Sequence, residues 1–204
     1  MSATKKTRVI GLMSGTSLDG LDCCCVDFYQ DGNGYKFEII AAKTFLYTHY
    51  WKNKLQQAFY LTPEKLSELS AVYGLYLSDC VNHFQNEFLA GKRAELIASH
   101  GHTVFHQPSK GITVQIGDGE IINKKTQIPV INDFRIKDVL LGGQGAPLVP
   151  VGDHFLFSEH DACLNLGGFS NISFIYSNVR IAFDIGPANL PLNLLCQRFF
   201  NCDF

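Results

Sequence analysis

The chain has 204 residues, of which 46% are hydrophobic, and its formal net charge is −2. This charge provides no general attraction to nucleic acid or to an anionic membrane. No apolar stretch is long enough for a transmembrane helix, and the run behind the basic N-terminus is broken too early, at Gly11, for a secretory signal.

Three strands are expected first, over residues 9–13, 22–30 and 35–47. The sequence Asp31-Gly32-Asn33-Gly34 is a strong hairpin signal between the second and the third. An antiparallel meander therefore opens the chain.

The loop between the first two strands is rich in glycine, hydroxyl and carboxylate groups. Its residues are Gly15, Thr16, Ser17, Leu18, Asp19, Gly20, Leu21 and Asp22. Backbone amides exposed in such a turn can bind an anion, while Asp19 and Asp22 would repel a bare phosphate. A bridging Mg²⁺ resolves this conflict, because it takes oxygen ligands. The alternative is an ordinary polar hairpin turn.

The seven cysteines are odd in number, and none has Cys-x-x-Cys spacing. Three of them are adjacent, at 23–25, where strand neighbours point to opposite faces and suit small apolar filler better than disulfides. This usage indicates a reducing compartment, hence the cytoplasm.

Helices follow the meander. A short one is expected over residues 50–60, and Thr62-Pro63 reads as an N-cap followed by proline at the first helical position. Apolar residues then recur every three or four positions from Leu66 to Phe88, which predicts a long amphipathic helix that ends near Gly91.

A buried strand over 95–99 is expected to run into a polar loop, residues 100–108, that contains His100, His102 and His106. His100 and His102 would share a face if the backbone were extended. No cysteine or acidic residue with matching spacing supports zinc, so a substrate-facing loop is favoured.

Further strands are expected at 112–116 and 128–131, with a helix between them that ends at about Thr126. Asp133 and Arg135 follow the second of these strands, either as a structural ion pair or as ligands of a polar substrate. The glycine-dense segment 141–147 reads as a hinge or linker.

The opening layout recurs after this segment, with strands at 162–166, 172–176 and 180–184 and a glycine-rich turn at 167–171. The expected domains are residues 1–147, complete, and 148–204, incomplete. The chain is thus expected to be truncated, or to have its other half on a separate polypeptide. Two glycine-rich turns, one per half, suggest a nucleotide whose phosphates are clamped between two domains.

Seven motifs, in order along nearly the whole chain, resemble those of the anhydro-N-acetylmuramic acid kinases. They occupy residues 11–22, 99–108, 114–118, 133–135, 142–150, 165–171 and 184–189. The resemblance implies an α/β, ribonuclease-H-like (actin-like ATPase) fold with two domains around a nucleotide cleft.

The resemblance also implies a coupled reaction on a recycled cell-wall sugar. Water attacks the anomeric carbon of the 1,6-anhydro bridge, O6 receives the γ-phosphoryl group of ATP, and N-acetylmuramate 6-phosphate forms with Mg²⁺ required. Asp184 corresponds to the base that activates water, a role that needs hydrogen-bond reach to that water. Phosphoryl transfer itself depends mostly on positioning and charge neutralisation.

The remaining implied sites fall into two groups. The loop 15–22, together with Gly167, Gly168 and Asn171, corresponds to ATP-binding residues, and Asp19 to a metal ligand. The residues implied for the sugar are His100, Asp133, Arg135, Gln144, Pro187 and Asn189.

Three positions depart from the family pattern: His102 stands where Gln is more frequent, Ile185 replaces Thr, and Asn193 stands where Asp is usual. The alternatives are a non-catalytic fragment or split half of such a kinase, and a related kinase for another 1,6-anhydro-sugar such as levoglucosan. A homodimer, or a second polypeptide that supplies the missing half, is the expected protein partner.

Overall fold

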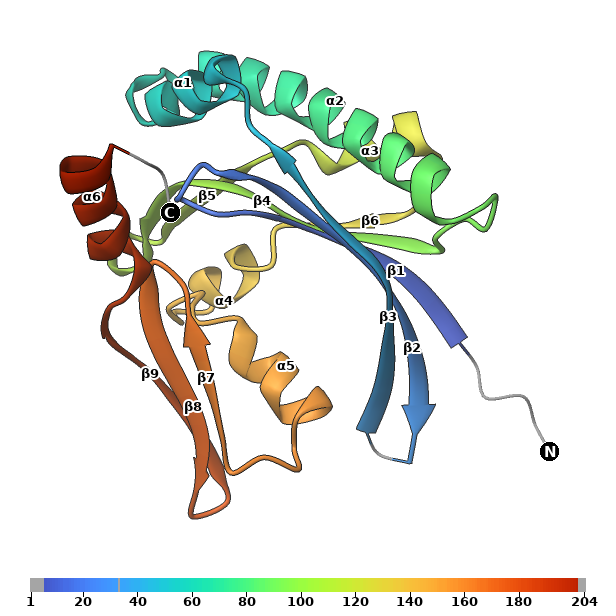
Figure 1. Ribbon diagram of the computed structural model, residues 1–204, viewed down its shortest axis with the longest axis vertical. Helices are drawn as coiled ribbons and strands as arrows, with labels where there is room; N and C mark the ends of the chain where they lie inside the picture. The colour runs from blue at the N-terminus through green and yellow to red at the C-terminus, as the bar shows by residue number, and fades with distance from the viewer. Residues whose placement is uncertain (1–5, 33, 202–204) are drawn as a thin grey trace. The chain divides into compact units, whose positions relative to one another are not determined.

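The computed structural model describes residues 6–32 and 34–201, and the chain divides into two compact units, residues 1–146 and 147–204. The first unit contains a six-stranded sheet in the order β3-β2-β1-β4-β5, with β6 also paired to β4 (Figure 1). Its strands are β1 (Lys6–Ser14), β2 (Gly20–Asp31), β3 (Gly34–Leu46), β4 (Leu96–Gln107), β5 (Ile112–Ile116) and β6 (Val130–Ile131).

The predicted meander is confirmed. β1, β2 and β3 pair antiparallel in sequence order, and Gly32 takes a left-handed φ of +59° in the turn that precedes β3. β4 then lies parallel to β1, and β6 lies parallel to β4. Strands β5 and β6 share one edge of β4, at residues 102–107 and 97–98 respectively. This mixed sheet, with its helices, confirms the predicted α/β class.

Helices cover the sheet because their sequence patterns provide one apolar face. The helices of the first unit are α1 (His49–Gln57), the 3-10 turn η1 (Ala58–Tyr60), α2 (Pro63–Phe88), α3 (Gly119–Thr126) and α4 (Ile136–Leu140). The Thr62 side chain accepts a hydrogen bond from the Lys65 amide, and Pro63 occupies the first turn of α2, as predicted.

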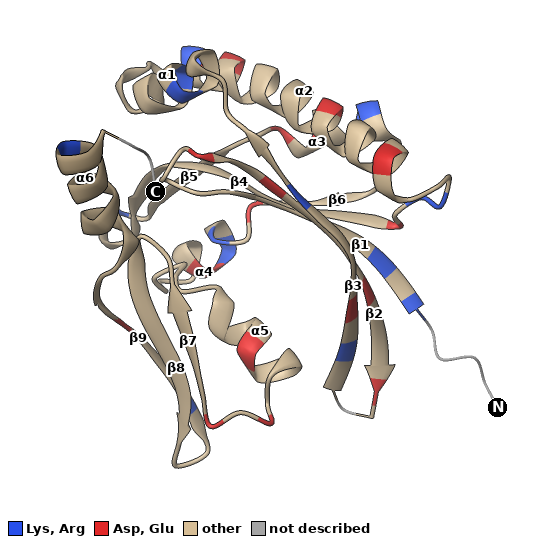
Figure 2. Ribbon diagram, viewed as in Figure 1, with Lys and Arg blue, Asp and Glu red and all other residues tan. Residues whose placement is uncertain are grey.

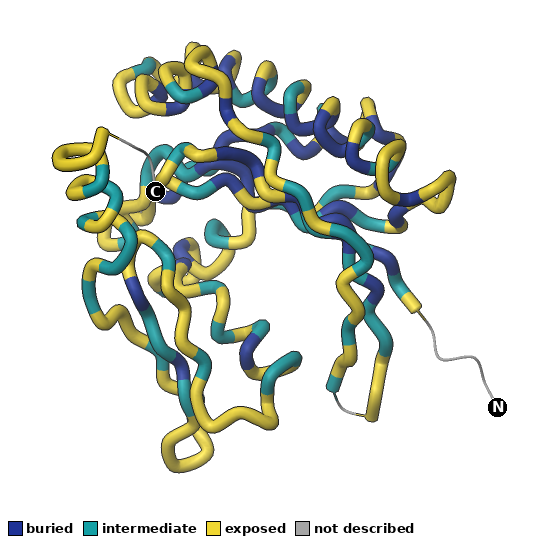
Figure 3. Tube along the Cα trace, in the orientation of Figure 1, coloured by how far each residue is buried: buried dark blue, intermediate teal, exposed yellow. Residues whose placement is uncertain are grey.

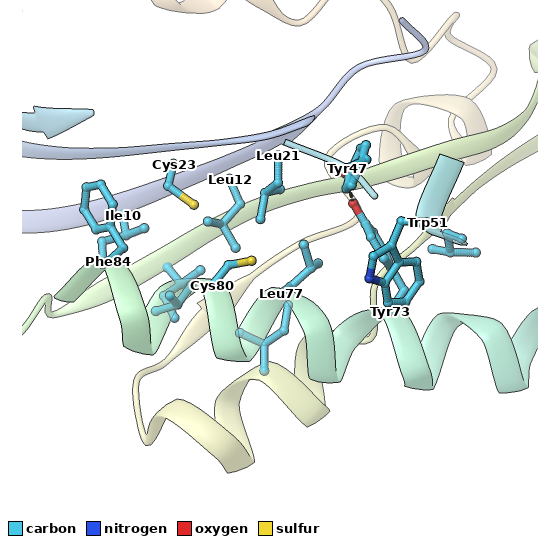
Figure 4. Close-up of a cluster of buried hydrophobic side chains, with 14 of the residues drawn as sticks. Ile10, Leu12, Leu21, Cys23, Tyr47, Trp51, Tyr73, Leu77, Cys80 and Phe84 are labelled. Carbon is cyan, nitrogen blue, oxygen red and sulfur yellow. Dashed lines mark hydrogen bonds between the residues drawn. The ribbon is translucent and has the colours of Figure 1, made fainter. Parts of the chain in front are cut away.

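The core of the first unit lies between α2 and the sheet (Figure 4). Tyr73, Leu77 and Phe84 of α2 are fully buried there, and each such side chain stabilises the fold by about 1.5–3 kcal/mol. Cys23 and Cys25 are buried in the same cluster as free thiols, and burial raises the pKa of both. Cys23 and Cys25 therefore serve as apolar filler, as predicted, whereas Cys24 is a free thiol that is only partly buried.

The second unit contains the antiparallel sheet β7-β8-β9 and two helices. Their bounds are α5 (Val149–Leu156), β7 (Ala162–Leu166), β8 (Phe169–Tyr176), β9 (Val179–Pro187) and α6 (Asn189–Phe200). Asp153 of α5 accepts a hydrogen bond from the Ser173 hydroxyl of β8, which accepts one from Arg180 of β9. This polar cluster attaches α5 to the sheet.

The second unit keeps much apolar surface exposed (Figure 3). None of the described residues of α6 is buried, and Leu194 and Phe200 are 60% and 75% exposed. Leu164 and Phe183 of the sheet are also at least half exposed. The other described residues of this unit therefore do not cover these apolar side chains.

Two sequence-based expectations were wrong in detail, and two helices of the second unit were not predicted. Residues 100–107 continue β4 instead of forming a loop, because β5 pairs with them. Residues 149–156 form α5, and residues 189–200 form the unpredicted helix α6. The turn expected at 167–171 contains only Gly167 and Gly168, since β8 begins at Phe169.

Candidate functional site

The first candidate element is the loop between β1 and β2, which spans Gly15–Asp19. Leu18 has a left-handed φ of +58°, and its amide donates to the Gly15 carbonyl oxygen at 3.4 Å. The Ser17 hydroxyl donates to Asp19 Oδ1 at 2.6 Å. Thr16, Ser17 and Asp19 are exposed, so this loop presents hydroxyl and carboxylate oxygens to solvent.

Gly20, Leu21 and Asp22 lie in β2, which corrects the predicted extent of the loop. The Leu21 side chain is buried in the core, and Asp22 Oδ1 accepts a hydrogen bond from the Thr44 hydroxyl on β3. A Cβ atom on Gly20 would lie 2.7 Å from the Phe45 carbonyl oxygen, so glycine permits the close approach of β3. A ligand role for these three residues stays a prediction.

An extra residue in β4 separates the two histidines that were expected to share a face. Leu12 pairs with Ser99 and Ser14 with His102, so between these pairs one residue of β1 opposes two of β4. Gly101 has a φ of +68° within this bulge. A one-residue slip reverses the side-chain faces, and His102 therefore lies on the face of Ser14, opposite to His100.

His100 contacts Arg135, the residue before α4. Its Nδ1 donates to the Gly101 carbonyl oxygen, and its Nε2 accepts from Arg135 Nε, both at 3.0 Å. This arrangement requires a neutral imidazole, and burial together with the nearby guanidinium lowers the pKa of His100. Arg135 Nη1 also donates to the Gly145 carbonyl oxygen at 2.7 Å. Arg135 thereby joins β4 to the segment that contains the exposed Gln144.

Asp133 lies near Asp118, the residue that caps the start of α3. It has a left-handed φ of +57° and accepts a hydrogen bond from Asn132 Nδ2 at 2.8 Å. Burial and the charge of Asp118 raise the pKa of Asp133. Asp118 caps α3 by accepting from the amides of Glu120 and Ile121. Asp133 and Arg135 thus bond to other residues, and the structure shows no ion pair between the two side chains. A role of either residue in binding a substrate stays a prediction.

On the opposite face of β4, His102 ends a buried chain of hydrogen bonds. Ser14 Oγ lies 3.0 Å from His102 Nδ1 and accepts from the Tyr47 hydroxyl at 2.8 Å. The Tyr47 hydroxyl also bonds to that of Tyr73 on α2. Sequence reasoning missed Tyr47 and Tyr73, because aromatic residues in this context read as core.

The His102 imidazole makes the stability of the first unit depend on pH. Burial, with a smaller contribution from nearby His100, lowers its pKa from 6.5 to about 4, while Ser14, Tyr47 and Tyr73 contribute no charge near neutral pH. The contribution of His102 to the free energy of unfolding is fully present above pH 6.5. It is lost as the pH falls through 4, by about 3 kcal/mol in total. Urea unfolding followed by the fluorescence of Trp51 should show this decline. His102→Asn should remove most of it, leaving the part due to His100, whereas an unchanged slope would contradict the assignment.

In the second unit, the predicted residues gather at one end of the sheet. The carbonyl oxygens of Gly167 and Gly168 accept hydrogen bonds from the first amides of α6, including 3.0 Å from Asn189 N to Gly167. Asn171 of β8 pairs in register with Asp184 of β9. Pro187 pairs with Phe169, next to the same turn. The sheet thus brings the six predicted residues of this unit to the β7–β8 turn and the end of β9. They are Gly167, Gly168, Asn171, Asp184, Pro187 and Asn189.

A bulge adjoins Asp184. Ser170 pairs with Gly186 and Asn171 with Asp184, so Ile185 is an extra residue in β9. Bulges of this kind redirect side chains and occur often beside active sites. Asp184 is exposed, as a residue that must reach a ligand has to be.

Among residues 6–32 and 34–201, no three His, Cys, Asp or Glu side chains gather into a metal site. The carboxylate of Asp19 and the hydroxyls beside it nevertheless provide the oxygen ligands that Mg²⁺ prefers when it also binds phosphates. The described helices include none that is long and apolar enough to cross a membrane.

Comparison with known families covers both units. The family model for anhydro-N-acetylmuramic acid kinase matches residues 7–204. The chain belongs to this family. The α/β, actin-like ATPase fold predicted from the sequence follows from this membership and agrees with the observed sheets.

Individual members of the family are similar along nearly the whole chain. An anhydro-N-acetylmuramic acid kinase of Haemophilus influenzae is 42% identical over 95% of this chain and 52% of its own length. Relatives with the same name are 37% identical in Pseudoalteromonas translucida and 35% in Bacillus cereus, with 55% and 54% of their lengths covered. The chain therefore spans about half the length of the curated relatives it matches.

Proposed function

We propose that the polypeptide containing this chain is an ATP-dependent kinase of peptidoglycan recycling. It converts 1,6-anhydro-N-acetylmuramic acid and water to N-acetylmuramate 6-phosphate. The family match carries this proposal, because its range, residues 7–204, includes the loop 15–19, the turn 167–168 and Asp184. The free thiols of the six described cysteines support a cytoplasmic location.

Asp184 is proposed to accept the proton of the attacking water. Its exposed carboxylate can accept a hydrogen bond from that water, and the bulge at Ile185 provides a reason for its orientation. The loop Gly15–Asp19 and the turn Gly167–Gly168 are proposed to contact the phosphates of ATP, with Gly20–Asp22 and Asn171 as further ATP-binding candidates. Bound Mg²⁺, held by Asp19, neutralises phosphate charge.

The sugar is proposed to contact His100, Asp133, Arg135 and Gln144 of the first unit. The charged guanidinium of Arg135 offers hydrogen bonds to hydroxyl and carboxylate groups, both of which N-acetylmuramic acid derivatives carry. Both ring nitrogens of His100 already bond, to Gly101 and to Arg135, so His100 would exchange one of these partners for the sugar. Pro187 and Asn189 are the candidates from the second unit.

A second polypeptide segment is proposed to complete the second unit. Exposed apolar side chains of α6 and of the β7-β8-β9 sheet, among them Leu164, Phe183 and Phe200, would be covered by it. Self-association into a homodimer is the other arrangement that would cover them.

Phosphorylation assays followed by mass spectrometry test the reaction. One arm uses the 204-residue chain alone. The other uses the joined chain, defined as residues 1–204 followed by the portion of the Haemophilus influenzae relative that the match leaves uncovered. We expect the joined chain to add the mass of phosphate plus water to 1,6-anhydro-N-acetylmuramic acid. Phosphate alone, or a preference for levoglucosan, would contradict the proposed reaction.

Removal of the Asp19 carboxylate should weaken the use of Mg²⁺. In the joined chain, Asp19→Ala should raise the Mg²⁺ concentration for half-maximal turnover by about 10- to 100-fold, the range seen when groups that support a metal are lost. Asp31→Ala is the control, because Asp31 is an exposed carboxylate in the β2–β3 hairpin that pairs with Lys36. An unchanged Mg²⁺ requirement would leave Asp19 with only a turn-stabilising role.

A further inference from the structure

Tyr47 contacts both ends of the Gly15–Asp19 loop. Its hydroxyl donates to Oγ of Ser14, the last residue of β1 before the loop, at 2.8 Å. Its backbone amide donates to the carbonyl oxygen of Asp19, the last loop residue before β2, at 3.0 Å. One residue, placed between β3 and α1, therefore holds the two ends of the loop at a fixed separation.

The hydroxyl of Tyr47 is itself held by a buried chain of donors. Tyr73 on α2 bonds to Tyr47, Tyr47 donates to Ser14, and Ser14 Oγ in turn lies within hydrogen-bond distance of His102 Nδ1. Figure 4 shows Tyr47 and Tyr73 turned towards each other across the core, with their hydrogen bond dashed. All four residues are at most 5% exposed, so water does not replace a lost partner readily.

The loop needs this support because its backbone is strained. Leu18 is a non-glycine residue at a φ of +58°, a conformation that persists only where the surrounding structure imposes it. Within the loop, the backbone hydrogen bond from the Leu18 amide to the Gly15 carbonyl oxygen is long, at 3.4 Å. The shape of the loop therefore depends on contacts from outside it, such as those of Tyr47 with Ser14 and Asp19.

We propose that Tyr47 is a positioning residue that fixes the loop for phosphate binding, with Tyr73, Ser14 and His102 holding its hydroxyl. The ligand named here rests on the proposed function, whereas the fixing of the loop does not. Tyr47 touches no reacting atom in this proposal. It acts through the backbone of the loop, whose shape determines how amides and hydroxyls meet a triphosphate with its Mg²⁺.

Amide hydrogen exchange on the 204-residue chain, read by NMR, tests the role without any ligand. Tyr47→Phe removes only the hydroxyl and keeps the ring and the backbone donor. We expect the amides of Leu18 and Tyr47 to exchange about fivefold faster in this variant, the effect of one typical hydrogen bond. The amide of Leu77, buried in α2, reports global unfolding and should change less.

Two control variants, Tyr76→Phe and His102→Asn, and the variant His102→Leu separate positioning of the loop from general loosening of the fold. Tyr76→Phe removes a hydroxyl from the same aromatic cluster, one that bonds to Cys80 instead of Ser14, and should leave Leu18 exchange unchanged. His102→Asn keeps an acceptor close to the position of Nδ1 and should preserve slow exchange, whereas His102→Leu should not. Equal acceleration at Leu18 and Leu77, or none in Tyr47→Phe, would overturn the proposal.

The joined chain tests the ligand. Tyr47→Phe should raise KM for Mg–ATP about fivefold while kcat and the KM for the sugar stay unchanged. Faster loop exchange with an unaltered KM for Mg–ATP would overturn the phosphate assignment. Absence of phosphorylated product from the unsubstituted joined chain would refute the proposed function instead, and the exchange measurements would still decide the role of Tyr47.

Discussion

Asp184→Asn in the joined chain should reduce turnover by about 10³-fold, within the range that a general base contributes. Asparagine keeps the size and polarity of the side chain but cannot accept the proton of water. The residue is exposed in β9 and pairs in register with Asn171, so the substitution should not disturb the sheet. Steady-state rates with 1,6-anhydro-N-acetylmuramic acid and ATP provide the measurement.

Asp161→Asn is the matched control, since Asp161 is an exposed aspartate before β7 in the same unit. It should retain the parental rate. Circular dichroism and thermal unfolding should match for both variants and the parent. A rate for Asp184→Asn that stays near that of Asp161→Asn would show that another group takes the proton.

Asp27→Ala should destabilise the first unit by about 3–5 kcal/mol, because it leaves buried Arg8 without a counter-charge. Asp27 is 1% exposed and accepts from Arg8 Nε at 2.6 Å, Arg8 Nη2 at 2.7 Å and Lys6 Nζ at 2.8 Å. Figure 2 shows these charges as basic residues on β1 beside acidic residues on β2. The hydrogen bonds from Arg8 lower the pKa of Asp27 to about 2.

Urea unfolding followed by Trp51, the single tryptophan, reports on the first unit alone. Glu87→Ala is the control, because its ion pair with Lys43 is partly exposed and should contribute no more than about 1 kcal/mol. Stability from Asp27 should be complete above pH 3.8 and decline as the pH falls through 2. If Asp27→Ala and Glu87→Ala lowered the free energy of unfolding equally, the cost assigned to leaving Arg8 buried without a counter-charge would be wrong.

Local patterns predicted the elements whose formation depends on nearby residues. The Thr62-Pro63 start of α2, the three-and-four spacing that follows it, and the hairpin turn before β3 were all confirmed. Each is set by interactions within a few residues of the chain. The motif resemblance, spread over both units, indicated the family.

Long-range pairing was harder to predict. The His100–Gln107 stretch looked like a loop, and only its pairing with β5 makes it a strand. The hydrogen bond from Tyr47 to Ser14 joins residues 33 positions apart, and that from Ser14 to His102 joins residues 88 apart. No local spacing encodes such contacts, so the residues that bracket the loop could not be selected from the sequence.

The bulge at Gly101 also limits how the length of this chain can change. The additional residue places His102 on the face of β4 that carries Ser14 and His100 on the face that carries Arg135. Deletion of a single residue at the bulge would therefore move the side chains that follow it in β4 to the opposite face of the sheet. Thr103 and Val104 would trade surroundings, and pairing with β5 would shift out of step. We therefore expect this strand to tolerate amino-acid replacements far better than insertions or deletions.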